Sequence, residues 1–446
     1  MSTSWYSFQV DGCRHQHHQS TQALTFAFPR DEAGSSSGGV VKIDLVSPLG
    51  SPQDFHIRQR AVLWLDQWKN ATTPPDDSQR IAFPHYDTST EPENADIEAY
   101  LAAKKKRAST YGYDRPTFLR ILYDECPSPV GRNNFALEIC LTVIPTSSST
   151  ESRKISTVTD ILALSEFKFP TAQSTSGFNE LAKLADELLL CMIQPLRSFG
   201  SKTPAISSVD SGPEGSRPSA DQDTAVRLSS LQKKVRKRDG YRCVMTGKLL
   251  VDLSDMYTSE EVKVRGLSFG VIKCAHIIPH MLNEVPNRLE LADEKRQFWS
   301  LLNLYSPGTS DSLNAEKIDT PSNALMLCSE AREAFSELKI WLRNIDGTYG
   351  AAEPVYTIEC VDHGRITSPF WLSENRIVLK SREGVPLPDP YLLNLHRALA
   401  MAASLSGAGE MLDVFMDEWF RPDVLASDGS DAGFLEARLR LLGACM

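Results

Sequence analysis

The sequence predicts an α+β protein with two folded parts, and three observations support this fold class. First, 446 residues exceed the length of one ordinary hydrophobic core, and 41% hydrophobic with 23% charged residues describes a globular chain. Second, residues 201–224 consist mainly of Ser, Pro, Gly, Asp and Thr, which is typical of a flexible linker. Third, apolar patterns of strand and helix period occur on both sides of that linker.

The composition divides the chain into regions that differ in their apolar content. We expect five of them, in chain order: a weakly ordered arm (1–39) with one strand at 24–28, an N-terminal α+β domain of unknown role (40–200), the linker (201–224), a second domain that carries the motifs described below (225–385), and a helical C-terminal extension packed on that domain (386–446).

Local periodicity predicts the elements within these regions. In the N-terminal domain we expect strands at 40–46 and 136–143 and helices at 55–69, 96–107 and 178–196. After the linker we expect a helix at 224–238 that Gly240 stops, then strands at 338–342, 355–360 and 377–380, and helices at 391–405, 411–419 and 433–442. The N-terminal domain offers no catalytic constellation, since the adjacent carboxylates Asp124 and Glu125 are expected in a turn.

Composition also excludes several classes of protein. No stretch approaches about 18 consecutive apolar residues, so we expect no membrane span. The N-terminus lacks the charged and apolar regions of a secretory signal, which predicts an intracellular protein, nuclear or cytoplasmic. Nine scattered cysteines without a Cys-x-x-Cys pair predict reduced thiols. Cys243 and Cys274 are candidates for a vestigial zinc pair, but Thr246 stands where a second cysteine would, so we expect buried thiols.

Three short motifs lie in order between residues 238 and 335. They read Arg-Asp-Gly-Tyr-Arg-Cys-Val-Met-Thr-Gly at 238–247, Cys-Ala-His-Ile-Ile-Pro-His at 274–280, and Asp-Thr-Pro-Ser-Asn-Ala-Leu-Met-Leu at 319–327. The second motif completes a β-prone run that Pro279 closes, and the third ends in an apolar run that predicts another strand.

This order resembles the HNH family of ββα-metal nucleases, in the version common in fungal proteins. The resemblance implies a two-stranded hairpin with a helix packed across it, one divalent ion (Mg²⁺, Mn²⁺ or Zn²⁺) and one general base. It puts His276 at the general-base position, where an ordinary pKa of about 6.5 leaves the imidazole largely neutral at working pH. It gives Asn323 the task of holding the hairpin loop, so that the base is aimed correctly.

Two positions depart from the family pattern. Ala275 stands where many members have an acid or a histidine before the base histidine. Arg332 stands nine residues after Asn323, where the helix histidine is expected, and Phe335 preserves the register. A guanidinium cannot ligate a cation because it stays protonated, but it can contact a phosphate.

Other side chains near the motifs are candidates to replace the missing ligand. His280 is the most plausible, because it lies four residues after His276. Cys328, Glu330 and Glu333 flank the start of the expected helix. Glu333 is a poor replacement, because one position along a helix turns the side chain by about 100°.

The charge distribution suggests weak, non-specific contact with nucleic acid, most plausibly DNA. A net charge of −10 argues against a protein that coats nucleic acid with its whole surface. A local basic run nevertheless adjoins the first motif, and its proposed phosphate contacts are Lys233, Lys234, Arg236 and Lys237, with Arg332 as a further candidate.

These observations leave three functions open. The first is an HNH-like protein whose metal site has degenerated and which binds or acts on nucleic acid. The second is an active metal-dependent endonuclease that cleaves DNA phosphodiester bonds with His276 as general base. The third, suggested by the genomic setting of fungal relatives, is an accessory role in a secondary-metabolite pathway. The missing helix ligand favours the first reading over the second.

Overall fold

The computed structural model describes eleven stretches of the chain: residues 22–27, 40–45, 52–72, 112–143, 175–200, 220–282, 289–313, 315–345, 352–362, 364–372 and 374–419. The chain divides into two compact units. Unit 1 comprises residues 1–190, 296–307 and 406–446, and unit 2 comprises residues 191–295 and 308–405. Each unit is described by itself. Within the described stretches, no helix has the length and apolar content that crossing a membrane requires.

Unit 1 is mainly helical, with one antiparallel hairpin. Its hairpin pairs β1 (Gln22–Ala27) with β2 (Val40–Leu45), as expected for both strands. Its helices are α1 (Pro52–Thr72), α3 (Arg115–Asp124), α4 (Pro129–Thr142), α6 (Thr175–Leu188), the end of α10 (Leu289–Tyr305) and α14 (Ala408–Trp419). Their core includes fully buried Phe118, Phe135, Ile139 and Leu181.

The end of α10 joins unit 1 through close backbone contact with α4. A Cβ atom at Gly131 would lie 1.9 Å from the Tyr305 carbonyl oxygen, so only glycine allows this approach. The Tyr305 hydroxyl donates to the Leu122 carbonyl at 2.7 Å, and its ring packs edge-on against Phe135. Asp124 ends α3 and Glu125 caps it, so these two carboxylates lie at a helix end.

The strand predicted at 136–143 is wrong, because these residues belong to helix α4. Ser128 caps the helix by accepting a hydrogen bond from the Gly131 N–H, and Pro129 stands at the first turn, where its missing N–H costs nothing. Residues 134–140 are all buried, including the polar Asn134 and Glu138, so the helix is buried around its whole circumference in this stretch. When every face of a helix is buried, the pattern of apolar residues cannot distinguish a helical period from the alternation of a strand.

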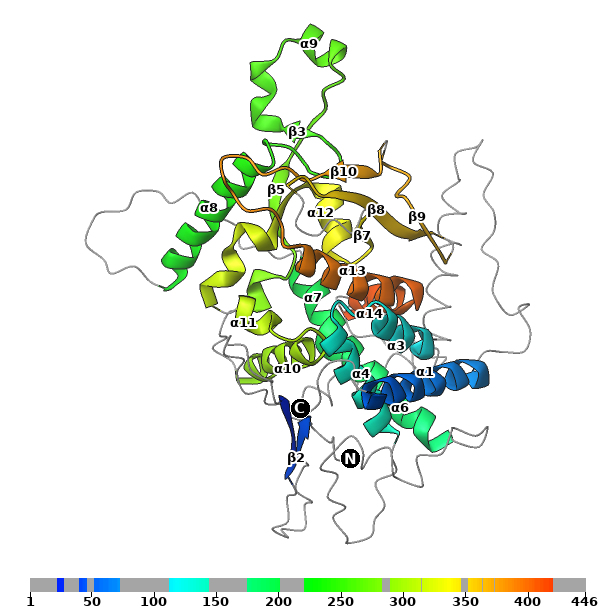
Figure 1. Ribbon diagram of the computed structural model, residues 1–446. Coiled ribbons are helices and arrows are strands. Elements are labelled where there is room, and N and C mark those ends of the chain that lie inside the picture. Colours follow the sequence, from blue (N-terminus) through cyan, green and yellow to red (C-terminus); the bar gives the residue numbers. More distant parts are fainter. Residues whose placement is uncertain are drawn as a thin grey trace, which may run out of the picture. The chain divides into compact units, whose positions relative to one another are not determined.

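Unit 2 begins with helices that lead to the first motif. The helix expected at 178–196 comprises α6, which belongs to unit 1, then a π-helical turn (Leu189–Ile193) in which the division between the units falls, and the start of α7 (Gln194–Gly200) in unit 2. Helix α8 (Ala220–Arg238) starts inside the predicted linker and ends at Gly240, which has a φ of +65°. A short parallel pair, β3 (Leu249–Leu250) with β4 (Phe269–Gly270), brackets a 3₁₀ helix (Val251–Met256) and α9 (Ser259–Val264), which projects from the unit in Figure 1.

The centre of unit 2 is the strand–strand–helix arrangement that the motifs predicted. Strand β5 (Ile272–His276) pairs antiparallel with β6 (Ala324–Cys328), in a register that sets His276 opposite Ala324 and Ile272 opposite Cys328. Every residue of β6 is buried. Helix α12 (Ser329–Ser336) follows β6 directly and buries Ala331 and Phe335 against the hairpin.

A second sheet and one helix complete unit 2. The sheet has β8 (Val355–Asp362) between β7 (Ile340–Asn344) and β10 (Arg376–Val378), and β9 (Arg365–Thr367) also pairs with β8 (Figure 1). Helix α13 (Pro390–Leu405) packs on β7 and β8, and its buried His396 stacks on Phe335 with ring centroids 3.8 Å apart. The expected strands and helices of this region are therefore present, with boundaries shifted by a few residues. The helices predicted at 96–107 and 433–442 lie outside the described residues.

A buried ion pair fastens helix α8 to the hairpin. Arg238 donates from Nε and Nη2 to the carboxylate of Asp239 at 2.7 and 3.0 Å, and both side chains are almost fully buried. The same guanidinium donates to the carbonyls of Pro321, Ala324 and Pro386 at 2.7, 2.7 and 3.1 Å. Asp239 also accepts from the Met326 N–H at 2.9 Å. This pair satisfies its own hydrogen-bonding groups, as a buried charge must.

Candidate active site

Two histidines and one aspartate meet at the end of the β5–β6 hairpin. His276 is the last residue of β5, His280 opens the 3₁₀ helix η4 (His280–Leu282), and Asp319 ends the 3₁₀ helix η5 (Ala315–Asp319). Asp319 Oδ1 lies 3.1 Å from His276 Nε2 and 2.8 Å from His280 Nδ1. One ligand atom from each residue falls within 4.8 Å of the other two. We call these three residues the His–Asp cluster.

The aspartate is the electrostatic centre of the cluster. Burial by itself would raise its pKa, but the hydrogen bonds and charges of His276 and His280 outweigh that effect and hold the pKa of Asp319 well below the usual 3.8. The carboxylate is therefore ionised at neutral pH and can only accept hydrogen bonds. Arg227 Nε approaches its other oxygen at 3.5 Å, which adds a weak contact.

Asn323 holds the loop that carries the cluster. Its Oδ1 accepts from the Ile278 N–H at 2.9 Å, and its Nδ2 donates to the carbonyls of Ile278 and Ile318 at 2.9 and 3.0 Å. Ile278 lies between His276 and His280, and Ile318 precedes Asp319. The fully buried amide thus connects the segment that carries the two histidines to the segment that carries Asp319.

The cluster is shielded from solvent. The side chains of His276 and His280 are each 5% exposed, and that of Asp319 is 1% exposed. Such burial strengthens the hydrogen bonds between charged and polar groups. It also means that a phosphate group reaches these atoms only if the surrounding surface opens.

The donor set fits a divalent ion. Zinc lies about 2.0–2.1 Å from nitrogen and oxygen ligands, so neighbouring ligand atoms in a tetrahedral site are about 3.3 Å apart. The two His–Asp separations of 3.1 and 2.8 Å are shorter than that value, as hydrogen bonds are, and the ligand atoms of the three residues lie within 4.8 Å of one another. Imidazole with carboxylate also suits manganese and other first-row ions.

The predicted phosphate contacts lie on two helices, α8 and α12. On α8, Lys233, Lys234 and Lys237 are exposed and Arg236 is half-buried. Lys237 forms an ion pair with Glu383 at 3.1 Å, which partly neutralises the charge of the lysine. Arg332 is half-buried on α12.

Asp319 is the residue whose role the sequence analysis missed. The signal was present, since Asp319 opens the third motif four residues before Asn323. However, an aspartate before a proline-containing turn is common, and its 43-residue separation from His276 hides the contact. Cys243 and Cys274 are both buried, as expected.

Residues 243–342 match the family model described as HNH endonuclease. The matched range contains β5, β6, α12 and the whole His–Asp cluster. Searches among curated proteins and among solved structures found no significant match. The C-terminal half of the chain therefore contains an HNH nuclease domain, and HNH domains generally depend on a divalent metal ion.

Proposed function

We propose that the HNH domain of this chain is a divalent-ion-dependent nuclease that acts on nucleic acid, with its ion site moved from the helix to the His–Asp cluster. One observation carries the proposal. His276, His280 and Asp319 converge at the end of the β5–β6 hairpin, although the helix position expected to supply a ligand holds Arg332.

His276 has the geometry of a general base. Because Asp319 is ionised, it fixes the imidazole tautomer by accepting a hydrogen bond from Nε2–H. The other ring nitrogen, Nδ1, is then an acceptor, and no described residue hydrogen-bonds to it. Nδ1 can therefore take a proton from a water molecule that attacks the phosphorus, while Asp319 stabilises the imidazolium that forms.

His280 and Asp319 would hold the ion. A divalent ion there would neutralise charge on the scissile phosphate and stabilise the departing oxygen. Asn323 keeps the two ligand-bearing segments at a fixed separation through its bonds to Ile278 and Ile318. Lys233, Lys234 and Arg236 of α8, with Lys237 and Arg332, would contact phosphates of the bound strand.

The test measures cleavage and ion content in the same set of proteins. Wild type should nick supercoiled plasmid with Mn²⁺ or Mg²⁺ and not with EDTA. His280→Ala and Asp319→Asn should lose both the retained ion and the cleavage. His276→Ala should keep the ion and lose cleavage by about 10²–10⁴-fold, as expected for removal of a general base. His56→Ala, at an exposed histidine outside the domain, is the matched control and should behave like wild type.

Two outcomes would change the assignment. Loss of the ion in His276→Ala would make His276 a ligand instead of a base. Absence of both ion and cleavage in folded wild type would remove the catalytic function altogether.

A second candidate function is nucleic-acid binding without cleavage. The low exposure of the His–Asp cluster and the arginine at position 332 favour it. On this reading, wild type binds DNA weakly and without sequence preference, and added salt steeply reduces the affinity. Changing Lys233, Lys234, Arg236 and Lys237 together to Gln should flatten the salt dependence. Arg332→His should then produce an ion-dependent cleavage that disappears when His276→Ala is added.

A further inference from the structure

Tyr241 has a backbone conformation that residues other than glycine rarely adopt. Its φ is +56°, in the left-handed region, and it directly follows Gly240, whose φ is +65°. Gly240 by itself supplies the left-handed residue that commonly ends a helix. At the next position Gly, Asn or Asp would adopt the same φ more easily, so tyrosine there costs free energy. Residues held in such conformations are concentrated at functional sites.

Hydrogen bonds on both sides of Tyr241 hold this strained backbone. Its N–H donates to the Arg236 carbonyl at 2.8 Å, and its carbonyl accepts from the Leu250 N–H at 2.9 Å. An isolated bridge between Arg242 and Leu249 continues the pairing. The point from which the tyrosine ring projects is therefore fixed between the end of α8 and β3.

The tyrosine ring is available to a ligand. Tyr241 is 39% exposed. Among the described residues, none forms a hydrogen bond with its hydroxyl, and no other ring or cation stacks on it. No polar or ring contact within the described chain thus accounts for a tyrosine at this position. A fixed and exposed aromatic ring is suited to stacking on a planar group.

Cations without acidic partners lie before and after the tyrosine. Lys233 and Lys234 are exposed on the last turns of α8, and Arg242 is exposed directly after Tyr241. None of these three cations forms an ion pair with a described residue. The surface around the ring therefore suits a ligand that carries negative charges.

The same end of α8 holds a further cation, and its acid is neutralised. The Arg382 guanidinium lies so close to Gly240 that a Cβ atom there would collide with it, and it donates to the Arg238 carbonyl at 3.0 Å. Asp239 is buried in its ion pair with Arg238. The positive charge at this helix end is thus not cancelled locally.

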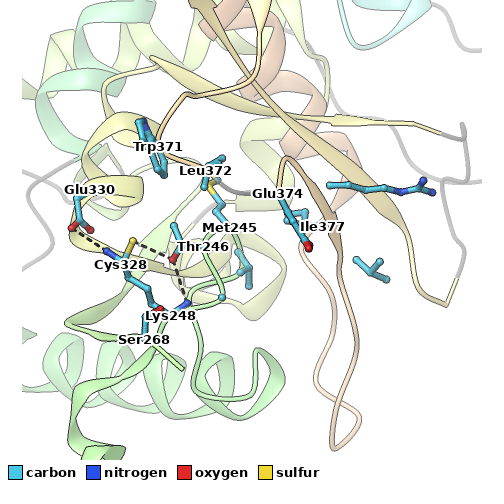
Figure 2. Close-up of a pocket in the computed structure, with 14 residues that line it drawn as sticks. Met245, Thr246, Lys248, Ser268, Cys328, Glu330, Trp371, Leu372, Glu374 and Ile377 are labelled. Atoms are coloured by element: carbon cyan, nitrogen blue, oxygen red, sulfur yellow. Dashed lines mark hydrogen bonds and ion pairs between the residues drawn. The ribbon is translucent and has the colours of Figure 1, made fainter. Parts of the chain in front are cut away.

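The cavity beside Trp371 has a different electrostatic setting. Its volume is about 780 Å³, and Trp371, which is 38% exposed, lies in its wall (Figure 2). Two cations in the lining are balanced by two carboxylates: Lys248 and Arg376 against Glu330 and Glu374. A lining without net charge does not attract a polyanion. Of these two exposed aromatic residues, Tyr241 is therefore the one placed to meet a nucleic acid.

We propose that Tyr241 stacks on an unpaired base of a single-stranded nucleic acid, whose phosphates contact Lys233, Lys234 and Arg242. The inference rests on the proposed nucleic-acid function and specifies its substrate as a single strand or an unpaired stretch of a longer one. Every base has a π face, so stacking on Tyr241 would not select a sequence. In a duplex the neighbouring base pairs cover those faces, and the tyrosine could not stack on them.

The first test measures binding by the full-length protein in EDTA, so that cleavage cannot interfere. The probes are a fluorescein-labelled single-stranded DNA oligonucleotide of mixed sequence and the duplex of the same sequence, followed by fluorescence anisotropy. Tyr241→Asn should bind the single strand about 5- to 150-fold more weakly than wild type, which is the effect of losing one stacked base. It should bind the duplex as wild type does, and Tyr241→Phe should bind both like wild type. The loss should persist at higher salt, because stacking releases no counterions.

Two controls separate binding from folding and from general aromatic exposure. Asparagine adopts the left-handed conformation more easily than tyrosine, so Tyr241→Asn should not lower the midpoint of thermal unfolding. Phe370→Asn is the matched variant, because Phe370 is 99% exposed and precedes Trp371 of the neutral cavity. We expect it to bind the single strand like wild type.

A second test needs no variant. Wild type is irradiated with a bromodeoxyuridine-substituted single strand and digested with trypsin, and the cross-linked peptides are identified by mass spectrometry. Trypsin releases Tyr241 in peptide 239–242, in which it is the only aromatic residue. We expect the cross-link on this peptide.

Three outcomes would overturn the stacking site. They are equal single-strand affinities of wild type and Tyr241→Asn, equal losses on the single strand and the duplex, and cross-links on other peptides only. Duplex binding with ion-dependent cleavage would then leave the proposed nuclease function standing. Conversely, Tyr241-dependent binding of the single strand by a wild type that holds no ion and cuts nothing would support the stacking site and reject only the nuclease mechanism.

Discussion

The two ends of the β5–β6 hairpin carry different chemistry on one backbone. At the end where His276 faces Ala324, buried polar groups are joined by strong hydrogen bonds to a charged aspartate and a structural amide. At the end where Ile272 faces Cys328, the contacts are made by sulfur, which is a weak donor and acceptor. The comparison shows that a single strand register can place a buried, charged hydrogen-bond network at one end of a hairpin and weakly hydrogen-bonded thiols at the other.

The largest effect should come from breaking the ion pair that fastens α8 to the hairpin. Arg238→Leu leaves Asp239 buried without its counter-ion and removes the donor to three carbonyls. We expect a loss of about 3–5 kcal/mol in the free energy of unfolding, measured by urea denaturation. Arg242→Leu, at an exposed neighbour, is the control. A loss below about 1 kcal/mol would mean that this contact does not fasten the hairpin.

The next largest effect should come from the loop amide. Asn323→Ala removes the partner of the Ile278 N–H and of two carbonyls in a buried place. We expect a loss of about 2–4 kcal/mol, since each unsatisfied buried polar group costs about 1–3 kcal/mol. Asn375→Ala, at an exposed asparagine, should change the same urea midpoint very little. Equal effects at both positions would contradict the special role of Asn323.

Asp319→Asn should have an intermediate effect that depends on pH. Near pH 7 it replaces a carboxylate that two histidines contact, and we expect a loss of about 1.5–3 kcal/mol. Because the folded pKa of Asp319 lies below its usual 3.8, its contribution is complete above that pH and is lost as pH falls towards the folded pKa. An acid titration of stability should therefore be steeper for wild type than for the variant. Parallel curves would show that Asp319 contributes nothing by its charge.

The smallest effect should come from the thiol end. Cys243→Ser keeps a similar shape and a hydrogen-bonding atom, so we expect a loss of about 1 kcal/mol or less. Thermal unfolding of the reduced protein, with Cys274→Ser as the buried comparison, measures it. A loss as large as that of Asn323→Ala would remove the contrast between the two ends.

The sequence predicted the polar end better than the thiol end, for physical reasons. His276 and Asn323 lie in short motifs whose order matches a family, and strand β6 is a continuous apolar run. Asp319 and His280 meet only because two loops fold together, which no local pattern records. The contact of Cys328 with Thr246 arises because the turn after α8 packs against β6, and no local pattern records it. Helix α4 was predicted as a strand because residues 134–140 are buried on every side, so their polarity does not follow a helical period.

The contacts of the buried Arg238 guanidinium set a lower limit on the length of any fragment that could fold by itself. Two of its acceptors are the carbonyls of Pro321, just before β6, and of Pro386. Both Arg238 and Pro386 lie outside the matched range 243–342. His396 of α13, which packs on Phe335, also lies outside it. The matched segment alone therefore lacks contacts that hold the HNH motifs in place. A fusion protein or an expression fragment would need the chain from α8 through α13 to transplant the site intact.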